Sequence, residues 1–176
     1  MNREILRLAI PNIISNITVP LLGMVDLAIM GHLESELYIG AIALGGLIFN
    51  FIYAFFSFLR MGTSGFTAQA FGEKNRQELI LMFGRSMLLA AVGGLVIILL
   101  QYPIDLISFF LLDGSEEVEA LAREYFYIRI YAAPASLGIM VLSGWFIGMQ
   151  NARYPMIVAI FINVINIGAN LFFVYS

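Results

Sequence analysis

The sequence predicts an all-α integral membrane protein, and three observations carry this prediction. Of its 176 residues, 61% are hydrophobic and only 12% are charged, whereas soluble domains carry roughly 25% charged residues. The mean hydropathy is +0.91. The chain also contains five charge-poor stretches, each close to the roughly 20 apolar residues that cross a bilayer. Twelve acidic and nine basic side chains are too few to cover a water-exposed surface.

The charge-poor stretches predict five transmembrane helices. Their apolar parts lie at 8–31, 39–59, 86–104, 126–149 and 155–175. The helices themselves are expected near 5–31, 39–71, 77–104, 116–149 and 153–175. The first stretch is expected to remain in the protein as a span, because its polar residues interrupt it more than the apolar region of a cleaved signal peptide allows.

The segments between the helices alternate in charge, which predicts their sides of the membrane. Basic residues gather at the N-terminus and in the second and fourth loops, whereas the first and third loops are acidic. By the positive-inside rule the N-terminus is cytoplasmic. In the third loop, Ser115 followed by Glu116, Glu117 and Glu119 is typical of a helix N-cap with acids in the first turn. The fourth helix is therefore expected to begin near residue 116.

Composition excludes several kinds of chemistry. The chain has no cysteine, which excludes disulfides and thiolate metal sites. It has one histidine, which argues against multi-His metal sites and Ser-His-Asp catalysis. An intramembrane enzyme would need paired acids, a His-rich cluster or a Ser/Lys pair at membrane depth, and the sequence offers none. We expect no enzyme activity, no metal site and no nucleic-acid partner.

Asp26 is the candidate functional residue that stands out most. It lies inside the first span, where an acid costs about 2.5–3.5 kcal/mol on insertion scales. Partial burial disfavours its charged form, which is what a reversible proton or cation site needs. The alternative is an interfacial acid that caps the end of the span.

Other polar residues of the first span share a face with Asp26. Asn12, Ser15 and Asn16 recur at helical spacing with it, so we expect this stripe to line a protein or water cavity. Pro11 and Pro20 each remove a backbone donor and are candidate helix bends. Such bends serve either gating or simple packing, and the sequence leaves both open.

The fifth span carries a second polar stripe. Asn163, Asn166 and Asn170 lie at offsets of 0, 3 and 7, on one face of an otherwise apolar helix. Asn170 is about as far from the end of its span as Asp26 is from its own, at about 1.5 Å per residue, so both stripes are expected to line one cavity. Alternatively, each asparagine bonds across a helix interface, typically for under about 2 kcal/mol.

Three further features have open roles. Arg60 either pairs with an acid in the bundle or reaches the headgroups, and Arg129 is expected to extend to the interface. Pro134 is a third candidate bend. Gly144 and Gly148 form a GxxxG motif, for which we expect close helix packing.

Over essentially its whole length, the order of motifs resembles one family, the multidrug and toxic compound extrusion (MATE) transporters, in particular their DinF-like bacterial branch. The matching stretches are LAIPNIISN at 8–16, VPLLGMVDLAIMGHL at 19–33, FLRMGTSGFTAQAFG at 58–72, APASL at 133–137 and GWFIGMQNARYP at 144–155. These stretches are specific as a set.

The resemblance implies a twelve-helix transporter with two six-helix lobes in the bacterial cytoplasmic (inner) membrane. This chain would supply five helices of the N-terminal lobe, with the sixth helix and the C-terminal lobe absent. Such transporters exchange protons or sodium ions for amphipathic, often cationic, drugs and toxic compounds. The expected partners are these small molecules, membrane lipid and the second lobe.

The resemblance also implies an ion site. In family members with such a site in the first lobe, an acid on the first helix joins an Asn-x-x-x-Asp pair on the fifth. Asp26 matches the first acid and Asn166 the asparagine, but Asn170 stands where the second acid would be. Since a hard cation prefers several oxygen ligands and negative charge, proton coupling is favoured over sodium coupling, with no other cofactor. The alternative function is a flippase for lipid-linked precursors, which a cavity rich in buried Arg and Lys would favour.

Overall fold

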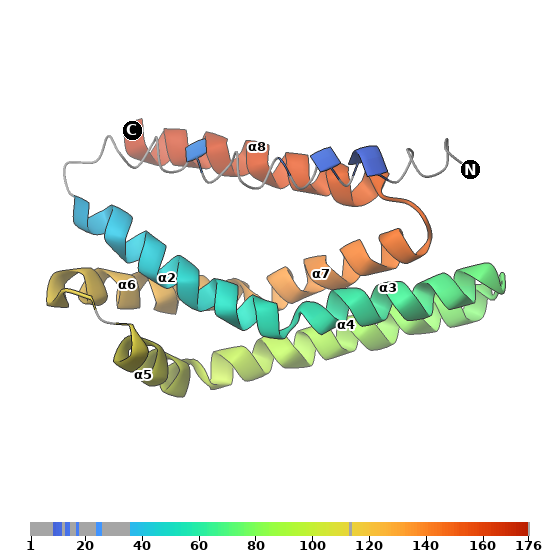
Figure 1. The fold of residues 1–176 in the computed structure, drawn as a ribbon, viewed down its shortest axis with the longest axis horizontal. Helices are drawn as coiled ribbons and strands as arrows, with labels where there is room; N and C mark the ends of the chain where they lie inside the picture. The colour runs from blue at the N-terminus through green and yellow to red at the C-terminus, as the bar shows by residue number, and fades with distance from the viewer. Residues whose placement is uncertain are drawn as a thin grey trace.

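The structure, a computed structural model, describes residues 9–11, 13–14, 17, 24–25, 36–112 and 114–175. All elements in this part of the chain are helical (Figure 1). They are α2 (Glu36–Phe55), α3 (Ser57–Gly72), α4 (Arg76–Leu99), α5 (Gln101–Leu111), α6 (Glu116–Arg129), the 3₁₀ helix η1 (Ile130–Ala132), α7 (Ala133–Gly148) and α8 (Arg153–Tyr175).

Four helices of the described part are long and apolar enough to cross a bilayer. They cover Leu37–Gly72, Arg76–Leu99, Glu116–Gly148 and Arg153–Phe172. The predicted fold class, an all-α integral membrane protein, is therefore confirmed. Most of the first expected span, 5–31, lies outside the described residues. The cytoplasmic position of the N-terminus stays a prediction.

The three middle transmembrane segments are interrupted, which differs from the continuous helices expected at 39–71, 77–104 and 116–149. The break between α4 and α5 falls at Leu100, and helix then continues to Leu111 instead of ending near 104. Pro103 explains this break, because it has no N–H for the carbonyl four residues earlier and its ring crowds that carbonyl. Pro134 acts in the same way on Ile130, the first residue of η1.

The break between α2 and α3, at Phe56, has no proline. There the ring of Phe56 lies against Gly93 of α4, at a distance of 3.0 Å from the position that a Cβ on this glycine would take. The backbone of Pro134 packs against the neighbouring Gly94 in the same way. The position that a Cβ on Gly94 would take lies only 2.4 Å from the Pro134 Cα. Glycines on α4 thus let the interrupted regions of two other segments approach it closely.

The turns after α3 and α7 share one geometry. Lys74 and Gln150 have φ angles of 56° and 58°, and each stands where a Schellman motif places a left-handed residue. After α7, the Asn151 N–H donates to the Phe146 carbonyl at 2.9 Å, closing the motif. After α3, the Asn75 side chain then accepts from the backbone N–H of Glu78 at 3.1 Å and caps α4.

The GxxxG motif on α7 packs directly against α3. A Cβ on Gly144 would lie 2.5 Å from the carbonyl oxygen of Arg60, and one on Gly148 would lie 2.7 Å from that of Ser64. Only glycine permits such an approach of two backbones, so the predicted role of this motif in close helix packing is confirmed.

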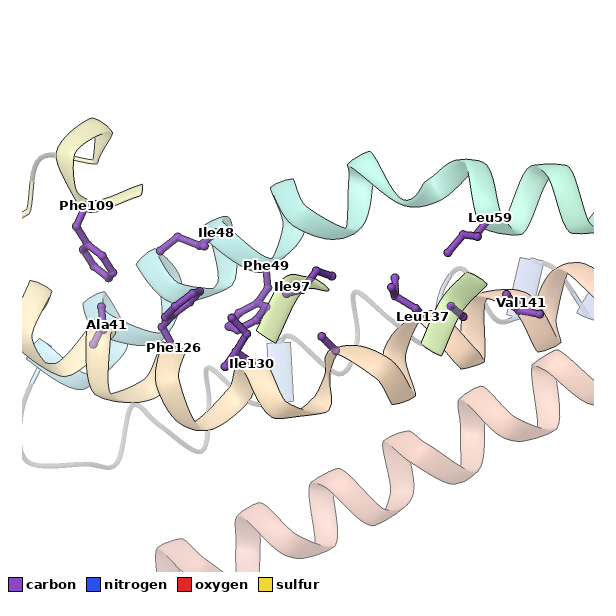
Figure 2. Packing of buried hydrophobic residues seen from close by; sticks show 13 residues of the cluster. Ala41, Ile48, Phe49, Leu59, Ile97, Phe109, Phe126, Ile130, Leu137 and Val141 are labelled. Atoms are coloured by element: carbon purple, nitrogen blue, oxygen red, sulfur yellow. The ribbon is translucent and has the colours of Figure 1, made fainter. Parts of the chain in front are cut away.

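The largest buried side chains of the core lie where α2 crosses α6 (Figure 2). The rings of Phe49 and Phe126 are stacked with their centroids 5.5 Å apart, and Ile130 and Leu137 extend the core along the α6 to α7 segment. This core joins α2 to α6, while α3, α4 and α7 pack together beyond the breaks. Figure 1 shows α8 along one side of this bundle and α5 on the opposite side.

Candidate functional site

The asparagine stripe of the fifth span lies on α8, which is one continuous helix. Asn163, Asn166 and Asn170 are all half-buried. On the other faces of α8, Phe161 and Val164 are more than half exposed. Because lipid accepts apolar side chains and disfavours amides, this pattern turns the asparagine face toward protein.

The structure brings two of the predicted site residues into direct contact. The Asn170 Nδ2 donates a hydrogen bond to the Asn166 Oδ1 at 2.9 Å. One helical turn separates the two residues, which is the spacing at which side chains meet on a helix. Asn163 has an interaction of its own. The bond fixes the orientation of two amides at membrane depth, and their groups offer neutral donors and acceptors but no charge.

The predicted residues of the first span are only partly visible. Asp26, Asn12, Ser15, Asn16 and Pro20 lie outside the described residues. Their meeting with the α8 asparagines therefore stays a prediction.

The two remaining predicted bends fall in described segments. Pro11 is a buried helical residue. Pro134 occupies the first turn of α7, directly after η1, at the interruption described above.

The two arginines with open roles differ in their surroundings. Arg129 ends α6 and donates to the Tyr125 hydroxyl. Its guanidinium lies 4.8 Å from the centroid of the Phe49 ring. Arg129 is exposed and contacts aromatic rings of α2 and α6. Its extension to the membrane interface stays a prediction. Arg60 is exposed and forms no salt bridge with any residue that the structure describes.

Sequence reasoning missed a buried acid on α5. Asp105 is 4% exposed, and its Oδ2 accepts from Arg123 of α6 at 2.7 Å. The guanidinium of Arg123 also lies 4.5 Å from the centroid of the Phe109 ring. Asp105 falls one residue beyond the expected end of the third helix, where an acid looks like a solvated loop residue. The available signal was Pro103, which is typical of a helical first turn.

No group of three His, Asp or Glu side chains in the described ranges could hold a metal ion. Among the predicted site residues that the structure describes, the polar side chains are the three amides of α8. These amides can form hydrogen bonds and coordinate a cation weakly through their oxygens.

Comparison with known proteins places these features in a family. The MatE family model matches residues 11–172. The chain is 45% identical over 166 residues to the DNA damage-inducible protein F of Escherichia coli K12, covering 94% of this chain and 36% of that protein. It is 26% identical over 167 residues to a probable multidrug resistance protein NorM of Thermotoga maritima, covering 95% and 36%.

A solved structure has the same fold. A MOP superfamily transporter from Pyrococcus furiosus superposes with a TM-score of 0.87 at 24% identity, covering 98% of this chain and 38% of that one. This chain thus spans about a third of the length of the relatives that it matches. The extent of the family match and the identity to the E. coli protein agree, and the chain belongs to the MatE family of membrane transporters.

Proposed function

We propose that this chain forms part of the first lobe of a proton-coupled antiporter. The complete protein exports amphipathic or cationic drugs and toxic compounds across the bacterial cytoplasmic membrane. The observation that carries the proposal is the Asn166–Asn170 hydrogen bond on the half-buried face of a membrane-crossing helix. The family membership and the two relatives named above as multidrug resistance protein and DNA damage-inducible protein support the same general function.

The chemistry of the amide pair supports protons over sodium ions. Asn166 and Asn170 offer oxygen ligands without charge, and a bare Na⁺ in a low-dielectric site needs a compensating negative charge. In the proposed site only Asp26 supplies one. One proton fully neutralises the charge of a single carboxylate, so Asp26 alone suffices for reversible proton binding. For a sodium ion, a single carboxylate provides fewer anionic ligands than a hard cation prefers.

The flippase alternative gains no support from the described residues. It would be favoured by buried basic side chains that receive phosphate groups. Arg60 and Arg129 are both exposed. Arg123, the basic residue that reaches a buried partner in this part of the chain, is already paired with Asp105.

Transport by the full-length protein in proteoliposomes tests the proposal. A lipophilic fluorescent cation serves as substrate, and proton and sodium gradients are imposed separately. We expect the proton gradient alone to drive export, and Asp26→Asn to abolish it. Glu116→Gln, which changes an exposed acid in the first turn of α6, serves as the matched control and should transport normally.

A further variant separates the two ions. Asn170→Asp adds the second carboxylate that the amide now replaces, so it should permit sodium-driven export. Undiminished export by a well-expressed Asp26→Asn protein would refute the proposal, as would sodium-driven export by the unmodified protein.

A further inference from the structure

An apolar groove lies on the face of the bundle that carries α5, away from the asparagine stripe. Its volume is about 760 Å³, within the range of ligand sites. Leu47, Phe51 and Phe55 of α2 line one wall, and Ile107 and Leu111 of α5 are among the residues of the other. Of the described residues that line it, Ser108 alone is polar.

Contacts with α6 hold α5, which forms one wall of the groove, in position. On one face of α5, Asp105 and Phe109 are buried and bind Arg123 of α6 through the ion pair and the ring contact. Ile107 and Leu111 lie on the groove face of the same helix. Because removing Arg123 would leave the buried Asp105 carboxylate unpaired, the ion pair holds α5 against α6, while the groove face of α5 stays uncovered by α2. These contacts therefore stabilise the position of the wall that α5 contributes to the groove.

Both walls of the groove lack positive charge. Residues 33–59 and 86–122 contain no lysine, arginine or histidine. The lining of the groove extends to Leu112. The first turn of α6, which begins four residues later in the chain, carries three acids, Glu116, Glu117 and Glu119.

Contacts place Glu119 at this end of the groove. Its Oε1 accepts from the backbone N–H of Gly114 at 3.3 Å. A Cβ on Gly114 would lie 3.1 Å from Leu44 of α2 and 3.2 Å from the Glu119 Cγ. Leu44 lies one turn before Leu47 and Ile48, which line the groove. The Glu119 carboxylate thus lies close to the end of the groove, near both α2 and the residues that follow α5.

We propose that this groove binds one acyl chain of a phospholipid with a primary amine headgroup, such as phosphatidylethanolamine. The acyl chain fills the apolar groove, and the ammonium group lies at the Glu119 end. The acidic end attracts this cation and repels anionic headgroups, for which the walls offer no basic partner. The site is separate from α8, so it does not depend on the proposed transport function.

Photocrosslinking of the full-length protein in nanodiscs tests the site. The probe is phosphatidylethanolamine with a diazirine on one acyl chain, and crosslinked residues are identified by peptide mass spectrometry. We expect labels on the groove segments 47–56 and 96–112. Ile107→Trp should fill the groove and reduce this labelling by about tenfold, equivalent to the loss of one decade in affinity.

Leu106→Trp is the matched control. Leu106 is the adjacent residue and is 58% exposed against 57% for Ile107, but it does not line the groove. Its labelling should equal that of the unmodified protein. Leu47→Trp fills the groove from the opposite wall and should reduce the labelling as Ile107→Trp does. With two such variants, the test still gives a result if one of them fails to fold.

The headgroup is tested by competition with unlabelled lipids. Phosphatidylethanolamine should displace the probe better than phosphatidylglycerol, and Glu119→Gln should reduce this preference, whereas Glu124→Gln, an exposed acid on the same helix, should not. Three results would overturn the proposal: equal competition by both lipids, equal effects of the Ile107 and Leu106 variants, or no label in the groove because another part of the polypeptide covers it.

Discussion

Replacing Gly144 by alanine adds one methyl group where α3 and α7 lie in close contact. The new carbon would lie 2.5 Å from the Arg60 carbonyl oxygen, whereas real Cβ contacts stay above 3.0 Å. Both atoms are fixed to helix backbones, so the helices must separate by about 0.5 Å, which weakens neighbouring dispersion contacts. Overpacking costs about 1–3 kcal/mol, and the higher helix propensity of alanine offsets about 1 kcal/mol. The difference between these two terms is a net loss of about 1 kcal/mol, with an upper limit of about 2 kcal/mol.

Thermal unfolding of the full-length protein in detergent measures this loss as a fall of several degrees in the midpoint. Gly138→Ala is the control, because Gly138 is buried on the same helix. Its added Cβ would meet the Met87 sulfur at 3.6 Å, an ordinary contact. That variant should be as stable as the unmodified protein or more so. Equal midpoints for the two variants would show that α3 and α7 do not pack at this distance.

Three further predictions concern local contacts, each measured by the same unfolding assay. Arg123→Gln strands the Asp105 carboxylate and should cost about 2 kcal/mol, less than the ~3–5 kcal/mol of fully buried pairs because Arg123 is 41% exposed; adding Asp105→Asn should recover most of this loss, and no recovery would argue against the pair. Gln150→Gly relieves a left-handed residue with φ of 58° and should stabilise by about 0.5–1 kcal/mol; a lower midpoint would contradict this. Trp145→Phe removes the indole hydrogen bond to the Leu79 carbonyl, 3.1 Å long, and should cost about 1 kcal/mol; an unchanged midpoint would mean that the bond contributes nothing.

Local signals in the sequence determined the membrane class and much of the helix layout. Composition identifies lipid as the surrounding solvent, because few charges cannot cover a surface in water. The first turn of α6 begins at Glu116, at the position that Ser115 and the acids indicate. The asparagine face of α8 also follows from the sequence, because helical periodicity places residues at offsets of 3, 4 and 7 on one side.

The tertiary structure alone decided which residues meet. The GxxxG motif indicates a close approach, but nothing near Gly144 in the chain specifies Arg60 as its partner. The helix break at Phe56 has no local signal and coincides with a contact to Gly93. Asp105 has the character of a loop acid until Arg123, 18 residues away, is brought to its side. Periodicity and turn chemistry act within a few residues, whereas burial and ion pairing depend on elements that only folding brings together.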